Sequence, residues 1–398
     1  MRFFQLFLIT GIILLYLFKQ ILLVEFSLDA YRYVIILLGL LALISAFQYK
    51  GGVPFAVILY FLIFHLSISL YFLNYGTAAE GFYEGYYVYF LQPFILWFSL
   101  KESTISSERI LNIISNTVFI SIIGVILYYI NIFFPLDFVE KIFKQEFTLI
   151  GSNVVIRNTS IYGNSLVAAG IGLAQMCSSA ILVSLGKKKH ILTLLLSFLF
   201  ICTTLSRRSI VAGSILLLLL FIMSPKTTKK IMLNTSVFLS FFLFIYAWEY
   251  MVMFFDRFVS SVDFSKSNAS NTSRINAVIA GIIIIFTNLT GTGMGSLSSL
   301  GKEVENLHNS ENFIGVTESM YTTFIGEVGL IFTLPIFILF YFSISNKSKV
   351  IRWLLVYPFI VESIMGLGLI NPAVNFMFFL IYFSYKKKPT KRHDKQYI

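Results

Sequence analysis

The chain has 398 residues, of which 57% are hydrophobic and only 12% are charged. Soluble domains carry about 25% charged residues, so this composition excludes an ordinary soluble protein and predicts an integral membrane protein. The net charge of +11 lies largely in short clusters between apolar runs and in the C-terminal tail. Positive-inside bias explains that pattern, and we expect a lipid bilayer rather than nucleic acid as the partner of these charges.

Apolar runs recur along the chain, and most approach the ~20 residues that a helix needs to cross a bilayer. Strands of a membrane barrel would alternate in segments of about ten residues, so these runs predict helices. We predict an all-α, polytopic membrane protein with a single transmembrane domain over residues 1–398 and about twelve spans. The predicted spans are 3–24, 33–49, 53–73, 86–100, 110–134, 161–185, 190–205, 209–224, 231–253, 318–344, 353–370 and 372–385.

Charge clusters set the predicted sidedness of these spans. The tail, residues 386–395, is rich in lysine and is expected in the cytoplasm. Counting back from it, the other clusters fall on the same side, and they contain Lys50, Lys101, Arg109, Lys187, Lys188, Lys189, Lys226, Lys229, Lys230, Lys347, Lys349 and Arg352. An even number of spans returns the chain to the side on which it starts. We therefore predict a multi-pass protein with both termini in the cytoplasm.

The outer side carries two long connections, residues 135–160 and 254–317. The second is a large outer loop between the ninth and tenth spans. Its apolar segment 275–286 is too short to cross a bilayer, so we expect a helix that lies on the outer leaflet or dips into it. Against the usual bias, the basic residues of this side include Arg32, Arg157, Arg207, Arg208, Arg257 and Arg274. Arginine matches two phosphate oxygens at once, so this set predicts a phosphate-bearing ligand.

Three arginine positions are candidate ligands, and each has a structural alternative. Arg157 precedes the sixth span and is either a phosphate clamp or an interfacial arginine that caps a helix or touches lipid headgroups. Arg207 and Arg208 are adjacent in a tight turn, where their repulsion calls for an anion from a ligand or a headgroup. Arg274 opens a helical segment, where a cation opposes the helix dipole at a cost of about 0.3–1 kcal/mol. Such a local conflict is typical of functional sites.

Acidic residues and one histidine complete the candidates. If the tenth span begins at Glu318, Glu327 lies roughly 13 Å further into the membrane, at about 1.5 Å of rise per residue. Glu362 lies at a similar depth from the other face. Acids at such depth are functional or are paired for structural reasons. His308 titrates near neutral pH, so it is either a base or a solvated loop residue.

A glycine cluster, Gly291-Thr292-Gly293-Met294-Gly295, ends the apolar segment of the outer loop. It follows no predicted strand, so it predicts a flexible turn and no nucleotide-binding motif. The outer face carries no Asp-x-Asp pair and no His/Asp cluster, and we therefore predict neither a metal nor another cofactor.

Four stretches together resemble the O-antigen polymerase and O-antigen ligase family of bacterial membrane glycosyltransferases, over about residues 157–331. The matching stretches are Arg157 with Gly163-Asn164, Ser206-Arg207, Ser273-Arg274 followed by Gly291-x-Gly293-x-Gly295, and Tyr321 with Glu327-x-Gly329. The family's outer turn reads Ser-Arg-Gly, and here Arg208 replaces the small residue. Ligases carry His-Asn nine residues before the glutamate, where this chain has Glu318 and Ser319. That departure favours a polymerase.

The resemblance implies a GT-C-like fold and metal-independent glycosyl transfer. The enzyme would polymerise polyprenyl-diphosphate-linked oligosaccharide repeat units into O-antigen, the polysaccharide of lipopolysaccharide, or into a capsule-type polymer, at the outer face of the bacterial cytoplasmic (inner) membrane. A chain-length regulator protein is a further partner that the family implies. The catalytic residues would be Arg157 and Arg274, which hold the diphosphate, and Glu318, the base. The substrate-binding residues would be Arg207, Arg208, His308, Tyr321 and Glu327.

Two other functions stay open from the sequence. An O-antigen ligase would transfer the finished polymer to another lipid. A twelve-helix flippase or ion-coupled transporter fits the number of spans and the buried acids Glu327 and Glu362. Transporters of that kind have glycine- or proline-broken spans in corresponding halves, and the sequence shows no such pair.

Overall fold

The computed structural model describes residues 2–48, 55–75, 82–101, 105–134, 146–150, 153–246, 269–294, 297, 319–345, 350–354, 356 and 371–384. Within these ranges the regular structure is helical except for one antiparallel hairpin of two strands, which pairs Glu146 with Arg157 and Ile150 with Asn153. The predicted helical class is therefore confirmed, and the hairpin is a small addition to it.

The first half of the chain supplies the elements α1 (Arg2–Leu17), α2 (Lys19–Phe26), α3 (Ala30–Gln48), α4 (Phe55–Tyr75), α5 (Phe82–Tyr86), the π-helix η1 (Tyr87–Leu91), α6 (Gln92–Lys101), α7 (Ser107–Asn116), α8 (Val118–Phe133), β1 (Glu146–Ile150), β2 (Asn153–Arg157), the short 3-10 helix η2 (Ser160–Tyr162) and α10 (Ser165–Ser184). The second half supplies α11 (His190–Thr203), α12 (Arg207–Met223), α13 (Lys226–Tyr246), α15 (Ala269–Thr287), α17 (Met320–Val328), α18 (Leu330–Ser345) and α20 (Pro372–Ser384).

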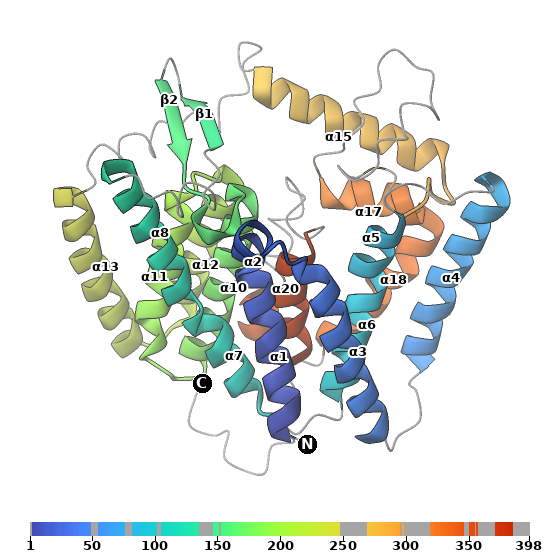
Figure 1. Ribbon diagram of the computed structural model, residues 1–398, viewed down its shortest axis with the longest axis horizontal. Helices are drawn as coiled ribbons and strands as arrows, with labels where there is room; N and C mark the ends of the chain where they lie inside the picture. Colours follow the sequence, from blue (N-terminus) through green and yellow to red (C-terminus); the bar gives the residue numbers. More distant parts are fainter. Residues whose placement is uncertain are drawn as a thin grey trace.

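Most helices form an upright bundle, and the hairpin and α15 lie at one end of it, which we call the upper end (Figure 1). Two contacts mark the opposite, lower end. The Oγ of Ser107 donates a hydrogen bond to the carbonyl of Ser384, so α20 ends beside the start of α7. Lys187 forms an ion pair of 2.9 Å with Glu108, which joins the α10–α11 connection to the same helix. The lysine-rich α10–α11 connection is thus at the end away from the hairpin.

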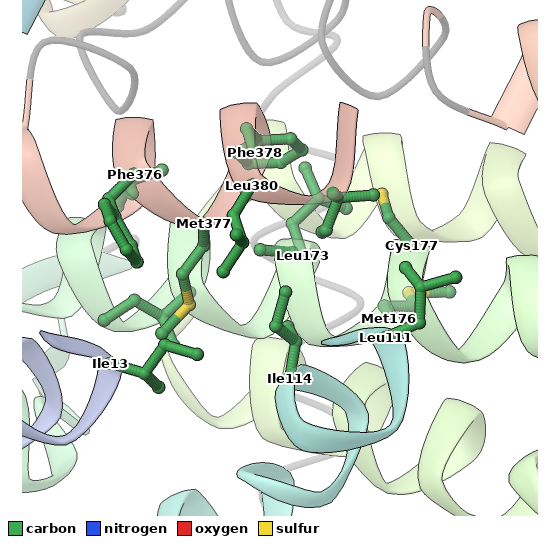
Figure 2. Close-up of a cluster of buried hydrophobic side chains, with 14 of the residues drawn as sticks. Ile13, Leu111, Ile114, Leu173, Met176, Cys177, Phe376, Met377, Phe378 and Leu380 are labelled. Atoms are coloured by element: carbon green, nitrogen blue, oxygen red, sulfur yellow. The ribbon is translucent and has the colours of Figure 1, made fainter. Parts of the chain in front are cut away.

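Helix α10 is the centre of the larger hydrophobic core, and almost every one of its residues is buried. It begins where the side chain of Asn164 accepts hydrogen bonds from the backbone of Leu166 (2.8 Å) and Val167 (3.1 Å), which caps the helix. Figure 2 shows α10, α1, α7 and α20 meeting through apolar side chains. The residues labelled there are Ile13, Leu111, Ile114, Leu173, Met176, Cys177, Phe376, Met377, Phe378 and Leu380.

Gly170 gives a test of this packing, because a Cβ at this position would lie 2.9 Å from both methyl groups of Val374. Valine is stiff at χ1 and cannot swing away. We expect Gly170→Ala to lower the free energy of unfolding by about 1–3 kcal/mol through overpacking between α10 and α20. Thermal unfolding of the purified protein in detergent measures the effect. Gly39→Ala in α3 is the control, since a Cβ there meets nothing within 4 Å, and an equal loss in both variants would contradict the argument.

A buried polar cluster joins α1, α6 and α20. The hydroxyl of Tyr16 donates to Gln92 Oε1 at 2.6 Å and pairs with the hydroxyl of Tyr87 at 2.7 Å. Gln92 Nε2 donates in turn to Asn375 Oδ1 (2.9 Å) and to the carbonyl of Pro372 (3.0 Å). Because these polar groups satisfy one another, the cluster fixes how the three helices meet.

Several of the helices are apolar enough to cross a membrane. In the described ranges, three are also long enough, Ala30–Phe47, Ser107–Asn131 and Ser165–Ser184, and the number rises to five when each of two bent helix pairs is counted as one span. Further apolar helices are 10–17 residues long. Membrane association therefore stands, whereas the predicted number of about twelve spans and the GT-C-like arrangement are not confirmed.

Two predicted spans are wrong as continuous helices. The span predicted at 3–24 is bent by 66° where α1 meets α2, and the span predicted at 318–344 is bent by 118° where α17 meets α18. The other predicted spans coincide with helices, except that most of 353–370 lies outside the described residues. Hydropathy does not detect either bend, because the apolar runs continue through both.

Helix α15 lies across the upper end of the bundle, above α17 (Figure 1). It contains the apolar segment that the sequence assigned to the outer leaflet. Ile279, Ile283 and Phe286 are exposed along one stripe, while Ile284 is buried against Leu297. An exposed apolar stripe on a transverse helix is what an interfacial helix presents to lipid. Its location at the leaflet stays a prediction.

Candidate functional site

The predicted site residues that the structure describes belong to elements at the upper end of the bundle (Figure 1). They are Arg157 at the end of β2, Arg207 and Arg208 at the start of α12, Arg274 in α15, and Tyr321 and Glu327 in α17. The predicted base Glu318 and His308 lie outside the described residues. For Arg157, Arg207 and Arg274 the structure describes the backbone position.

Two of the arginine connections lie side by side. The backbone amide of Asn158, next to Arg157, donates a hydrogen bond to the carbonyl of Thr203 at 3.4 Å. Thr203 ends α11, and Arg207 begins α12 a tight turn later. The chain therefore brings the backbones of Arg157 and the Arg207-Arg208 pair together. We call this place the arginine junction. The position of Arg274 relative to it is set by α15, which the described contacts tie to α17.

Buried polar residues line the arginine junction. They are Asn158, Thr159, Ser160, Thr204, Ser206 and Ser209. The turn between α11 and α12 is held locally, because Leu205 takes a left-handed backbone conformation (φ 52°) and the hydroxyls of Ser206 and Ser209 lie 3.2 Å apart. Hydroxyl and amide groups beside three arginines provide donors for the oxygens of an anion.

The loop that follows Arg157 is fixed to the core. Ser160 has a left-handed backbone conformation (φ 48°), and its amide donates to Asn158 Oδ1 at 2.7 Å. The Ser160 hydroxyl donates to the carbonyl of Ser121 in α8 (3.2 Å), and the hydroxyl of Tyr162 pairs with that of Ser121 (2.7 Å). A strained loop that is held by buried contacts is a common way to place a functional side chain.

Asn158 is a candidate that the sequence did not single out. Its side chain is fully buried, and within the described residues its Nδ2 amide has no hydrogen-bond partner. An unpaired buried donor costs about 1–3 kcal/mol, and an acceptor on a bound ligand would remove that cost. Only its position beside Arg157 pointed to it in the sequence.

The second part of the site is the junction between α17 and α18. The helices meet at Gly329, whose φ of 95° is open to glycine and strained for other residues. A Cβ on Gly329 would lie 2.7 Å from the carbonyl oxygen of Thr290, and one on Gly291 would lie 2.7 Å from the amide of Gly329. Gly293 faces the ring of Tyr71 at a similarly close distance. We call these contacts of Gly291, Gly293 and Gly329 the glycine clasp.

Hydrogen bonds close the glycine clasp. The amides of Thr292 and Gly293 donate to the carbonyls of Gly326 (2.8 Å) and Glu327 (3.0 Å). The hydroxyl of Ser67 in α4 donates to the carbonyl of Val328 at 2.9 Å. Backbone groups that a bent helix leaves without partners are costly in an apolar environment, and here the loop and α4 satisfy them. The cluster predicted as a flexible turn is thus a close-packed partner of α17.

Glu327 lies inside this arrangement. Its side chain is 1% exposed, and its Oε1 accepts a hydrogen bond from the amide of Leu297 at 2.9 Å. The hydroxyl of Tyr89 interacts electrostatically with the same carboxylate. The bend at Gly329 removes the continuous helix from which a depth of Glu327 was predicted. A role for Glu327 in binding substrate stays a prediction, and so does that of the half-buried Tyr321, whose ring packs against Phe337.

The residues that α4 contributes were missed by the sequence analysis. Ser67 and Tyr71 contact the α17–α18 junction across most of the chain, and no local pattern marks them. Among the described residues, no three His, Cys, Asp or Glu side chains are grouped as a metal site requires, and the absence of a metal or cofactor stays a prediction. Comparison with protein families, with curated proteins and with solved structures finds no match for this chain.

Proposed function

We propose that the chain is a membrane glycosyltransferase that polymerises polyprenyl-diphosphate-linked oligosaccharide repeat units at the outer face of the bacterial cytoplasmic membrane. The observation that carries the proposal is the arginine junction, where the amide of Asn158 meets the carbonyl of Thr203 and brings Arg157 beside the Arg207-Arg208 turn. Two separate connections with arginines and buried hydroxyls at one place suit a ligand with more than one phosphate. The position of α15 at the same end supports a contribution from Arg274.

The proposed reaction needs little covalent chemistry from the protein. A hydroxyl oxygen of the acceptor repeat unit forms a bond with the anomeric carbon of the donor chain. The bond between that carbon and the diphosphate oxygen breaks, and its electron pair leaves with the diphosphate. Arg157 and Arg274, with Arg207 and Arg208, stabilise the leaving diphosphate, and Glu318 takes the hydroxyl proton. Positioning and charge stabilisation supply the rate enhancement.

Purified protein supplied with lipid-linked repeat units alone tests the proposal. A polymerase lengthens these units into a ladder, and an O-antigen ligase leaves them unchanged because it needs a second lipid acceptor. We expect the wild-type chain to produce the ladder without added metal. An unchanged substrate would refute the polymerase.

Arg274→Ala gives the matching test in cells. Loss of a charged ligand for the leaving diphosphate is expected to reduce the polymer ladder by about a hundredfold. Polysaccharide electrophoresis measures the ladder, and immunoblotting of the membrane fraction controls for the amount of protein. A full ladder from Arg274→Ala at equal protein would count against the diphosphate site.

A transporter is the second candidate, and the bent helices favour it. The sequence showed no broken spans, but the structure has two, and the α17–α18 bend lies beside the buried acid Glu327. Discontinuous helices build substrate and ion sites in many carriers. Uptake of labelled lipid-linked oligosaccharide by proteoliposomes, lost in Glu362→Gln while chain growth continues, would support transport over polymerisation.

A further inference from the structure

Glu327 connects the glycine clasp to the chain that follows it. From Leu297 the sequence runs through His308 and Glu318 and returns to the described structure at Ser319, the first residue before α17. Glu327 lies two turns further along α17 and binds the amide of Leu297. Both ends of the segment that carries the predicted base are therefore attached to the same short helix.

We propose that Glu327 is a positioning residue for chain growth, which holds Leu297 and thereby fixes where this segment leaves the core. The activity part of this inference rests on the proposed function. In this role the carboxylate touches no substrate. It acts through the backbone of Leu297 on the placement of the residues that follow.

The anchoring of Leu297 is built from three contacts. Its amide donates to Glu327 Oε1 at 2.9 Å. Its side chain is buried against Ile284 of α15. It also fills the space beside Gly326, where an added Cβ would lie 2.5 Å from Leu297 Cδ1. The position of Leu297 thus depends on α15, on α17 and on one carboxylate oxygen.

The other end of the segment is anchored independently of Glu327. The carbonyl of Ser319 accepts hydrogen bonds from the amide of Thr323 (2.9 Å) and from the hydroxyls of Thr322 (3.0 Å) and Thr323 (2.9 Å). These bonds hold the start of α17 when the side chain at 327 is changed. The backbone of Glu327 is also held by Gly293. Replacing the Glu327 side chain should therefore release Leu297 without opening the α17–α18 junction.

The hydrogen bond requires an acceptor oxygen at the right distance and requires no charge. Glutamine keeps that oxygen at the same distance, whereas aspartate keeps the charge but is shorter by one methylene, and alanine removes both. A positioning role therefore predicts that Glu327→Gln is active and that Glu327→Asp and Glu327→Ala are not. A role in proton or cation transfer, or in charge-dependent binding, predicts that Glu327→Gln fails with Glu327→Ala.

Steady-state chain growth on lipid-linked repeat units measures these variants. We expect kcat within about twofold of wild type for Glu327→Gln, and a fall of about tenfold or more for Glu327→Asp and Glu327→Ala, with KM changed little. The exposed Glu25 in α2 is the control, and Glu25→Ala should match wild type. A Glu327→Gln protein as inactive as Glu327→Ala, or a defect confined to KM, would overturn the inference.

Amide hydrogen exchange supplies a readout that does not depend on activity. The peptide that contains Leu297 should exchange faster in Glu327→Ala and in Glu327→Asp than in wild type, and at the wild-type rate in Glu327→Gln. Unchanged exchange in Glu327→Ala would show that the carboxylate does not hold Leu297 and would overturn the inference. If the wild-type protein forms no polymer, the proposed function fails, and the exchange result still decides whether Glu327 anchors Leu297.

Discussion

Replacing Gly329 with alanine is expected to prevent stable folding of the α17–α18 junction. The residue has φ 95°, a backbone conformation that costs a residue with a Cβ about 1–3 kcal/mol. The new Cβ would also lie 2.7 Å from the carbonyl oxygen of Thr290 and 2.8 Å from the amide of Gly291. These are backbone atoms of a loop that is hydrogen-bonded on both sides, so they cannot move aside as a flexible side chain would.

The combined cost should be a large share of the ~5–15 kcal/mol that separates folded from unfolded domains. We expect Gly329→Ala to accumulate poorly in membranes and to lose its thermal transition in detergent. Gly186→Ala is the matched control, because Gly186 has a similar φ of 82° and a Cβ there meets nothing within 4 Å. This control carries the backbone strain without the clash. Equal unfolding temperatures for the two variants would show that the glycine clasp is not close-packed.

The sequence predicted the helices well, because each is a continuous apolar run with a recognisable start. Asn164 caps α10, and Asn371, before Pro372 at the first position of α20, accepts a hydrogen bond from the amide of Ala373 at 3.0 Å. Asparagine before a helix and proline at its first residue are local signals. Such signals need no knowledge of the rest of the chain.

The hairpin was missed, although the sequence carries a signal for it. Residues 146–150 and 153–157 are rich in β-branched and aromatic side chains, and Gly151-Ser152 separates them. Two such runs around a short turn predict a hairpin. The sequence analysis treated the whole of 135–160 as a connection, because it lies between two long apolar runs whose pattern dominated the interpretation.

The bend at Gly329 and the arginine junction could not be predicted from local pattern. Gly329 lies in an uninterrupted apolar run, and its left-handed conformation depends on Gly291 fitting against it. The junction depends on a contact between Asn158 and Thr203, which are far apart in the sequence. Both sites need the tertiary structure, because their partners come from other elements. Arginine on the outer side indicated the chemistry but not the meeting place.

The second large effect concerns the arginine junction and tests whether its two connections share one ligand. Arg157→Ala and Arg207→Ala are each expected to lower chain growth by about a hundredfold, since each removes a charged donor from the leaving diphosphate. If both arginines hold the same diphosphate, the double variant should lose far less than the product of the two single losses. Independent roles would make the losses multiply.

Arg32→Ala is the control for a general effect of charge at this end of the protein. Arg32 is exposed, and it forms an ion pair of 3.6 Å with Asp29 at the start of α3. If arginines here serve only to contact anionic lipid headgroups, Arg32→Ala should reduce activity as much as Arg157→Ala does. If the junction binds the diphosphate, Arg32→Ala should grow chains at the wild-type rate. The junction is distinguished from a basic membrane surface because its backbone contact holds two arginine connections at one place, where a single ligand reaches both.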